Sequence, residues 1–319
     1  RGPQSWDFGG KVLSRLQKDD PSHSLEYLDL PTDLAPYLNG IYVWRTAETV
    51  IDDHIPAYSG QMVVIAQGRG RMQFGSGDLE DAGVASFLAP MGESRRIVVE
   101  GPAFVCGLSL NHLGWATLTG LAVDEHQDRF LEPDYVLGER LGDELTALIP
   151  HWHAGTLDDA GLAGAMCDVA RKALTPLPNR QMAVIQRTVE WLASSIRPDI
   201  NDLYATLPYS KRQAQRLVAR FFGQSPVRLA RRFRAIRAAA HMLRPDIPEP
   251  IETGIQAAFY DQAHMIKEIR YFTGLTPKGL QQNAGSFADY LLGPDGRTPL
   301  DPFAATARTG NAPPRDGDD

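Results

Sequence analysis

Near the C-terminal end of the sequence, Asp261 precedes His264 by three residues, a spacing that places a carboxylate beside an imidazole on a helix. Such a pair is half of an acid/base site or half of a metal site. A metal site would need further ligands, and the surrounding stretch AFYDQAHMIKEIRYFTGLTP contains no second histidine and no cysteine. Asp is also a preferred N-cap residue, because its carboxylate accepts a backbone N–H. We therefore expect Asp261 to begin a helix and His264 to lie on the helix flank.

The other histidines give no stronger metal signal. His54 and His112 fall near the ends of expected strands, and the pair in His151-Trp152-His153 has no evident third ligand, so we expect a polar turn there. We predict no catalytic residue, no metal site and no cofactor, and hence no enzyme.

The opening stretch is the second copy of an internal repeat. SKRQAQRLVARFFGQSP at 210–226 aligns without gaps with DQAHMIKEIRYFTGLTP at 261–277, an offset of 51 residues. Each copy reads as an N-cap residue, a helix, a glycine that ends the helix and a Ser/Thr-Pro that begins the next one. A short helical segment precedes each copy, INDLYATL and IETGIQAA. The repeat therefore predicts two helix-turn-helix units.

Each predicted second helix has an apolar face and a polar face. In the helix at 210–222 the residues Arg212, Gln215 and Arg216 lie opposite the apolar ones, and in the helix at 261–273 the outward residues include Ala263, Lys267 and Arg270. The segment PVRLARRFRAIRAAAHML between the copies predicts a helical rod of roughly 27 Å. Such a rod could hold two helices in successive major grooves, about 34 Å apart.

Charge is distributed unevenly along the chain. The net charge is -7, yet residues 180–283 hold 16 Lys and Arg against 8 Asp and Glu, and residues 203–245 hold ten Lys and Arg and no acid. This block favours a region that binds a polyanion. Five arginines on the rod suit phosphate contacts or acidic partners, and each could equally be a solvated side chain: Arg228, Arg231, Arg232, Arg234 and Arg237.

The region from about 184 to 282 resembles the C-terminal DNA-binding domain of AraC-type bacterial transcription regulators. The resemblance rests on S-x-R-x-x-x-R, G-x-S-P and F-x-D-Q-x-H followed by T-G-x-T-P. It implies that Arg212, Gln215 and Arg216 read bases in the first helix and that Gln262, Ala263 and Lys267 face the DNA in the second. Tyr204 stands where the family typically has alanine. The full set of residues to which we assign DNA binding is Lys211, Arg212, Gln215, Arg216, Gln262, Ala263, Lys267 and Arg270.

Residues 40–112 read as short β-branched runs separated by glycine-rich turns such as AQGRGR and GSGD, a pattern typical of an antiparallel sandwich or barrel. The family resemblance makes this a cupin-like module. We predict an α+β protein with an irregular arm at 1–37, a cupin-like effector-binding or dimerisation domain with a helical connector at 38–175, the double helix-turn-helix domain at 180–283 and a disordered tail at 284–319. TPLPN at 175–179 is the expected linker.

The expected function is an effector-responsive transcription activator acting on promoter DNA, with RNA polymerase as a partner, a possible small-molecule effector and a possible homodimer. The alternative is a metal-dependent cupin enzyme fused to a DNA-binding domain. Candidate effector-binding residues are Trp44, Met62, Phe74 and Phe87, with core packing as the alternative. The helix at 157–174 is the candidate dimer interface, with ordinary packing inside the domain as the alternative. No run of 18 apolar residues is present, residues 1–20 lack the order of a signal peptide, and there are two cysteines. We expect a cytoplasmic, nucleoid-associated protein with no membrane contact.

Overall fold

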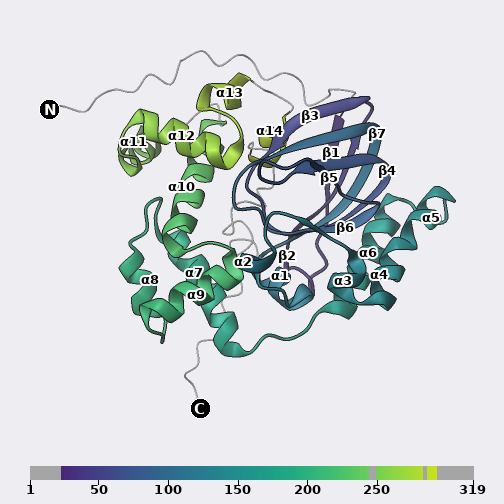
Figure 1. The fold of residues 1–319 in the computed structure, drawn as a ribbon, viewed down its shortest axis with the longest axis horizontal. Helices are drawn as coiled ribbons and strands as arrows, with labels where there is room; N and C mark the ends of the chain where they lie inside the picture. The colour runs from purple at the N-terminus through teal and green to yellow at the C-terminus, as the bar shows by residue number, and fades with distance from the viewer. Residues whose placement is uncertain (1–22, 244–248, 283–285, 293–319) are drawn as a thin grey trace.

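The computed structural model describes residues 23–243, 249–282 and 286–292. It consists of one antiparallel sheet and, after it, a series of helices that lie against the sheet on two sides (Figure 1). The strands are β1 (His23–Leu28), β2 (Leu38–Thr46), β3 (Val50–Ile55), β4 (Gln61–Gln73), β5 (Leu79–Asp81), β6 (Ala85–Leu88), β7 (Arg95–Leu110) and β8 (Phe130–Leu131).

The sheet is built around the long strand β7. The strand order is β1-β2-β7-β4-β6-β8, with β3 also pairing β7 and β5 pairing β4. Along β7 the segment 103–110 pairs β2 and the segment 95–100 pairs β3, while β4 pairs both segments from the other side. The first and last strands of this order, β1 and β8, do not pair with each other within the described residues, so the sheet is open there. The structure is therefore an open, cupin-like antiparallel sheet.

Residues alternate between the two faces of the sheet, as the period of a strand requires. On β7, Phe104, Cys106 and Leu108 point into one core, whereas Val99 and Val105 belong to a cluster on the other face. The first core is large because the helices of the N-terminal part (residues 23–173) all contribute apolar residues to it. The helices of this part are α1 (His112–Thr119), α2 (Val123–His126), α3 (Pro133–Leu137), α4 (Glu139–Thr146), α5 (Leu148–His153) and α6 (Asp159–Ala173).

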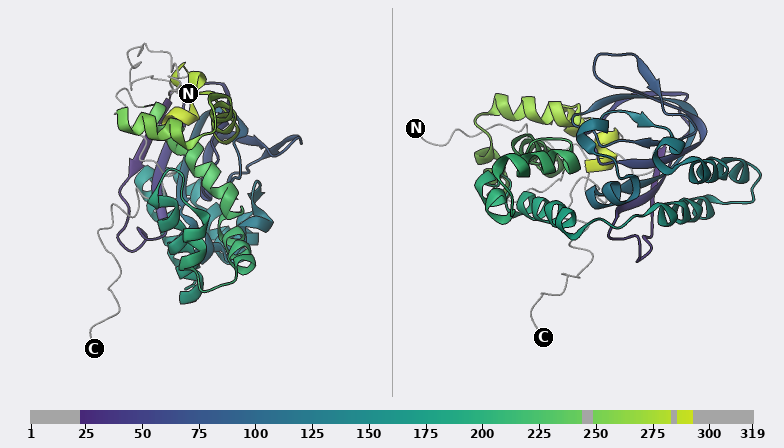
Figure 2. Two further views of the ribbon diagram at one scale, coloured as in Figure 1. Left: turned by 90° about the vertical axis from the view of Figure 1, so that its left-hand side faces the viewer. Right: turned by 60° about the horizontal axis from the view of Figure 1, so that its bottom comes forward.

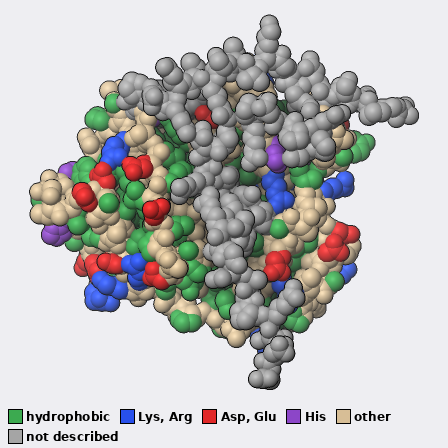
Figure 3. Space-filling model, turned by 180° about the vertical axis from the view of Figure 1, so that it is seen from behind, with side chains coloured by type: hydrophobic (Ala, Val, Ile, Leu, Met, Phe, Trp, Pro, Cys, Tyr) green, Lys and Arg blue, Asp and Glu red, His purple; other side chains and the backbone are tan. Residues whose placement is uncertain are grey.

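Helix α6 uses its apolar side inside this core. Leu162, Met166 and Val169 are each fully buried against the sheet. The outer side carries charge: Arg171 pairs with Asp33 at 2.6 Å, and other acidic and basic side chains are interspersed over the back of this part (Figure 3). The apolar residues of the candidate dimer helix thus pack within the domain, the alternative that the sequence left open.

The C-terminal helices lie to the left of the sheet in Figure 1, and the turned views of Figure 2 show them as a separate layer. A segment at 174–178 without helix or strand, which overlaps the expected linker 175–179, leads to the first of them. They are α7 (Asn179–Ser194), α8 (Ile200–Thr206), α9 (Lys211–Phe222), α10 (Pro226–Met242), α11 (Glu249–Ala258), α12 (Gln262–Thr273), α13 (Pro277–Gln282) and α14 (Phe287–Leu292).

Several local predictions for the sheet were wrong. The expected turn AQGRGR lies inside β4, where register shifts between Ile65 and Gln67 and between Gln67 and Arg69 bend the strand without ending it. Gly68 adopts a φ of 81°, which accommodates this irregularity. Two of the short runs expected within 40–112, RRIVVE at 95–100 and AFVCGLSL at 103–110, likewise form one strand, β7. His151-Trp152-His153 ends the short helix α5 and is not a turn.

The terminal segments also differ from expectation. The arm at 1–37 contains strand β1, and its residues 1–22 lie outside the described residues. The disordered tail was expected from 284, yet 287–292 form helix α14, which packs against β3 and α10. Residues 293–319 lie outside the described residues.

Candidate DNA-binding interface

The first helix-turn-helix unit consists of α8 and α9. Ser210 and Gln213 form a capping box: the Gln213 backbone N–H donates to the Ser210 hydroxyl at 3.4 Å, and the Ser210 N–H donates to the Gln213 side chain at 3.1 Å. Gly223 ends α9 with a φ of 76°, in the left-handed region that glycine favours. The start and the stop predicted for this helix are confirmed.

The two faces of α9 are sharply different. Ala214, Val218 and Phe221 are buried, in one core with residues of α7 and α8 such as Leu203. The remaining face is exposed, and the predicted DNA-binding residues of the first unit all lie on it: Lys211, Arg212, Gln215 and Arg216. Helix α9 is therefore held in place by its cap and its buried face, and it presents its polar face to solvent.

Tyr204 on α8 also contributes to this surface, although it was not among the predicted DNA-binding residues. The Gln215 side-chain amide donates to the Tyr204 hydroxyl at 2.9 Å, and the Lys211 ammonium lies 5.7 Å from the centre of the Tyr204 ring. Tyr204 thus orients two of the predicted DNA-binding side chains. The departure from the family-typical alanine was the only signal that could have pointed to it.

The second unit consists of α11 and α12. The Asp261 carboxylate accepts the His264 backbone N–H at 2.7 Å, so Asp261 is the predicted N-cap. Gly274, with a φ of 84°, ends the helix. Met265 is buried among the inward residues, and the predicted DNA-binding residues are all exposed: Gln262, Ala263, Lys267 and Arg270. Asp261 therefore contacts His264 through the backbone N–H and not through the imidazole ring.

His264 instead faces Glu268, a buried acid on the inner side of α12. Its Nε2 atom lies 3.2 Å from the Glu268 carboxylate, which is only 2% exposed. The same carboxylate accepts hydrogen bonds from Arg231 Nε at 2.6 Å and from Arg234 Nη2 at 2.6 Å, both on α10. This cluster fixes α12 on α10, so these two arginines are used inside the molecule as well as near its surface.

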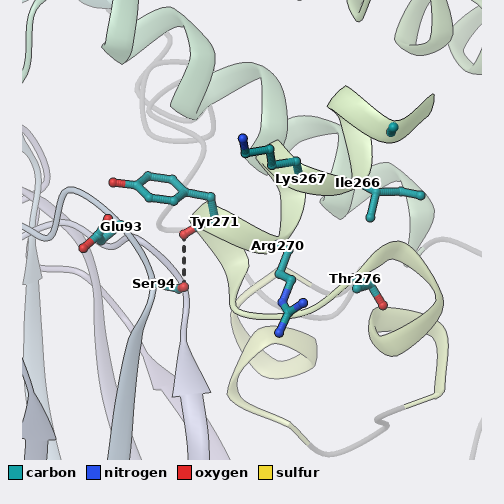
Figure 4. A pocket seen from close by; sticks show the side chains of 8 residues that line it. Glu93, Ser94, Ile266, Lys267, Arg270, Tyr271 and Thr276 are labelled. Atoms are coloured by element: carbon teal, nitrogen blue, oxygen red, sulfur yellow. Dashed lines mark hydrogen bonds between the residues drawn. The ribbon is translucent and has the colours of Figure 1, made fainter. Parts of the chain in front are cut away.

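The exposed face of α12 borders an open hollow of about 630 Å³ (Figure 4). Lys267 and Arg270 line one side of it, and Glu93 and Ser94, from the loop between β6 and β7, line the other. Tyr271 lies between the two sides, and its backbone carbonyl accepts the Ser94 hydroxyl at 3.1 Å. The hollow shows that the exposed polar face of α12 is accessible beside the sheet.

The β6–β7 loop (residues 89–94) also holds the first unit and α10. The Gln224 side chain, just after α9, donates to the Gly92 carbonyl at 2.8 Å. Arg232 of α10 is buried and donates to the Met91 carbonyl at 3.1 Å. Burial lowers the pKa of Arg232 to about 10, against the opposing effect of Asp128. The sequence left a phosphate contact, an acidic partner and a solvated side chain open for Arg232, and the structure instead buries it between α10 and the sheet loop.

Two backbone hydrogen bonds fasten the end of α12 to the N-terminal part. The Ser94 N–H donates to the Tyr271 carbonyl at 3.1 Å, and the Ala57 N–H donates to the Phe272 carbonyl at 2.8 Å. One loop of the sheet therefore contacts both helix-turn-helix units and the rod between them.

A buried histidine lies where α1 meets α9. The His112 ring is 4.1 Å from the Phe222 ring. Burial lowers the pKa of His112 to about 3, with a smaller contribution from the Arg232 guanidinium and an opposing hydrogen bond to the Phe221 backbone. The interface between the two parts thus contains a neutral imidazole at physiological pH.

The sheet face that is not covered by α3–α6 encloses a cavity of about 120 Å³. Among the four candidate effector-binding residues, Trp44 lines it. Met62 and Phe87 lie on the helix-covered face, fully buried in the core, and Phe74 packs against Phe130. The sequence neighbours of Met62 and Phe87 line the cavity instead: Val63, Ser86 and Leu88.

Other predicted features can be placed in the structure. Across the described ranges, His, Cys, Asp and Glu side chains form no group of three that could hold a metal ion. Cys106 and Cys167 are both buried free thiols. No helix in the described part of the chain combines the length and apolar character needed to cross a membrane.

Two helix-turn-helix units with exposed polar faces, joined by the rod α10, form the arrangement of a DNA-binding domain. Residues 203–283 match the family model described as a helix-turn-helix domain, and the C-terminal region is thus an AraC-type helix-turn-helix domain. This match spans about a quarter of the chain. Domains of this type belong to DNA-binding transcription regulators.

Comparison with curated proteins gives no match. Among solved structures, ToxT from Vibrio cholerae shares 8% identity over 82% of this chain and 98% of its own, with a TM-score of 0.42. ToxT with an unsaturated fatty acid bound shares 9% identity over 83% and 97%, with a TM-score of 0.39. The AraC-like transcriptional activator CuxR shares 12% over 66% and 79%, with a TM-score of 0.25.

Proposed function

We propose that this protein is a sequence-specific regulator of transcription that reads successive major grooves with α9 and α12. One observation carries the proposal: two capped helices at equivalent positions of a repeat expose basic and amide side chains, while their large apolar residues Val218, Phe221, Ile269 and Phe272 are buried. The rod between them has 17 residues and is about 26 Å long, which is compatible with a separation of one DNA turn.

The residue types determine how each helix contributes. Arg212 and Arg216 can each pair with guanine O6 and N7, and Gln215 with adenine N6 and N7, each pairing giving about 1–3 kcal/mol of discrimination. The second helix offers Gln262 and Lys267, a weaker reading set. We expect it to add phosphate contacts and overall affinity more than sequence choice.

Base reading by Arg216 can be tested on DNA selected from fragments of the source genome. Replacing Arg216→Ala is expected to weaken the selected site about 5- to 150-fold, at particular base pairs, while leaving random duplex nearly unchanged. Arg140→Ala, at an exposed arginine on α4, is the matched control and is expected to have no effect. Titration in gel-shift assays at several salt concentrations completes the test, since specific binding is expected to fall steeply with salt. Equal losses on all duplexes would indicate non-specific binding instead.

The regulator is proposed to act in the cytoplasm, on the nucleoid, as an effector-responsive activator. The cavity in the sheet supports the effector, because Leu88 and Ser86 of β6 line it and the β6–β7 loop that follows contacts both reading units. RNA polymerase and a second copy of the chain are the proposed protein partners. In vitro transcription with purified polymerase, together with sedimentation of the protein on and off DNA, tests the activator and homodimer proposals directly.

A further inference from the structure

The cavity in the sheet is small and closed on one side by a helix from the far end of the chain. Its volume of about 120 Å³ is well below the roughly 300–1,000 Å³ of pockets for drug-sized ligands. An engineered apolar cavity of about 150 Å³ binds benzene. The size therefore selects a ligand with a compact apolar body, about one ring in extent.

Four residues that line the cavity each carry a buried polar atom for which the described residues provide no hydrogen-bond partner. These atoms are Trp44 Nε1, Gln61 Oε1, Arg71 Nε and Ser86 Oγ. Buried polar atoms without partners are rare and costly, and several of them around one apolar cavity indicate a missing ligand or water. Trp44 and Arg71 can only donate, so the ligand needs an acceptor oxygen.

Helix α14 forms the remaining wall. The Phe287 ring lies 5.4 Å from the Trp44 ring, and Tyr290 and Leu291 also line the cavity. The Phe287 backbone N–H donates to the Asp53 carboxylate at 2.8 Å, which anchors the start of α14 on β3. The helix is therefore seated on the cavity by both a hydrogen bond and apolar contacts.

The same helix belongs to the DNA-binding side of the molecule. Ala288, Leu291 and Leu292 are buried in one cluster with Ile236 of α10 and Phe272 of α12. Helix α14 thus lines the cavity with Phe287 and Tyr290 and shares a buried cluster with α10 and α12 through Ala288 and Leu292, while Leu291 belongs to both. A ligand that contacts Phe287 would also favour the seated position of this cluster.

We propose that α14 is the lid of a binding site for a compact apolar compound carrying a hydroxyl or carbonyl oxygen, and that this lid couples the ligand to DNA binding. The coupling rests on the proposed DNA-binding function, whereas the ligand site itself does not. Occupation of the cavity holds α14, α10 and α12 together and thereby raises DNA affinity. Because such coupling is reciprocal, DNA raises ligand affinity by the same factor.

Phenol is a suitable probe, with toluene as a comparator of nearly equal size that lacks the oxygen. Calorimetric titration of the full chain is expected to show phenol bound at least tenfold more tightly than toluene. Trp44→Phe removes the Nε1 donor and is expected to abolish most of that difference while leaving toluene binding unchanged. Equal affinities of the two compounds for the unaltered chain, or no binding of phenol, would overturn the assigned ligand class.

Coupling is measured as the ratio of DNA affinities with and without phenol, expected to be at least about fivefold. Phe287→Ala is expected to reduce this ratio to about one, whereas Tyr135→Ala, at an aromatic residue that is 61% exposed on α3, keeps it. If Phe287→Ala destabilises the chain, Asp53→Asn, which weakens the same anchor, serves as the second variant. An unchanged ratio in both variants refutes the lid. If the unaltered chain binds phenol but binds no DNA site specifically, only the proposed function is refuted and the ligand site stands.

Discussion

Replacing Glu268 is expected to disturb α12 while leaving α9 intact. It should therefore distinguish the contributions of the two helices to DNA binding. The Glu268 carboxylate is 2% exposed and pairs with Arg231 and Arg234, whose side chains are 51% and 11% exposed. In Glu268→Ala, Arg231 can return to water, and its pairing contributes little. Arg234 remains buried without its partner, while its guanidinium still lies 4.9 Å from the centre of the Phe259 ring.

The magnitude follows from this difference in exposure. Removing one partner from a buried pair costs about 3–5 kcal/mol, because the remaining charge is left uncompensated. We expect Glu268→Ala to lower the free energy of unfolding by about 3 kcal/mol, the lower end of that range, since Arg234 is close to the surface. Glu268→Gln keeps an acceptor oxygen and loses the charge, so a loss of about 1–2 kcal/mol is expected.

Two measurements together test this reasoning. Urea unfolding followed by circular dichroism gives the free energy of unfolding, with Glu80→Ala on the exposed strand β5 as the control. Footprinting on the selected DNA site is expected to lose protection at the part read by α12 and to retain it at the part read by α9. A Glu268→Ala protein within about 0.5 kcal/mol of the unaltered one, the range of an ordinary surface change, and with a complete footprint would refute the role of this cluster.

The neutral state of His112 predicts a pH dependence: because its pKa falls from 6.5 to about 3 on folding, the stabilisation is complete above pH 6.5 and is lost as the pH falls toward 3. At pH 5 the loss is about 2 kcal/mol, measured by urea unfolding, and a His112→Asn variant should lack this slope. Asp261→Ala removes the N-cap of α12 and should lower stability by about 1 kcal/mol, whereas Asp261→Asn should retain most of it. Tyr204→Phe removes the hydroxyl that holds Gln215 and should relax base preference at one position by about 1 kcal/mol or less, with an unchanged melting temperature. Binding to a panel of single-base variants of the site checks the last expectation, and uniform loss across the panel contradicts it.

The repeat was predictable because it depends on local chemistry. N-caps such as Ser210 and Asp261 and stops such as Gly223 and Gly274 act within one helical turn, so the sequence alone places them correctly. The exposed reading faces follow from helical periodicity for the same reason. The assignment of bases to these residues stays a prediction.

The sheet was harder to predict because its details depend on pairing between distant segments. A glycine-rich stretch reads as a turn, yet β4 continues through Gly68 because β7 runs beside it over its whole length. The face to which a residue points depends on register, and a shift of one residue exchanges the faces. The candidate effector-binding residues Met62 and Phe87 therefore lie on the helix-covered face, while their neighbours Val63 and Ser86 line the cavity.

Charge type alone could not separate solvated arginines from buried ones. Glu268 looks like one acid on a basic helix, and only the packing of α10 on α12 brings Arg231 and Arg234 to it. Helix α14 was missed for a related reason. Its segment is short and lies among proline and glycine residues, so its stability comes from docking on β3 and α10 and not from local propensity.

Tyr271 and Phe272 lie at the end of α12, where backbone carbonyls have no partner inside the helix. Their oxygens accept hydrogen bonds from Ser94 and Ala57, so the sheet completes the C-terminal cap of a reading helix. A C-terminal half produced without the sheet lacks these donors, and the last turn of α12, which carries Arg270, frays. The two halves are therefore not interchangeable modules: a graft onto another N-terminal domain succeeds only if the new partner presents two N–H groups at the same places.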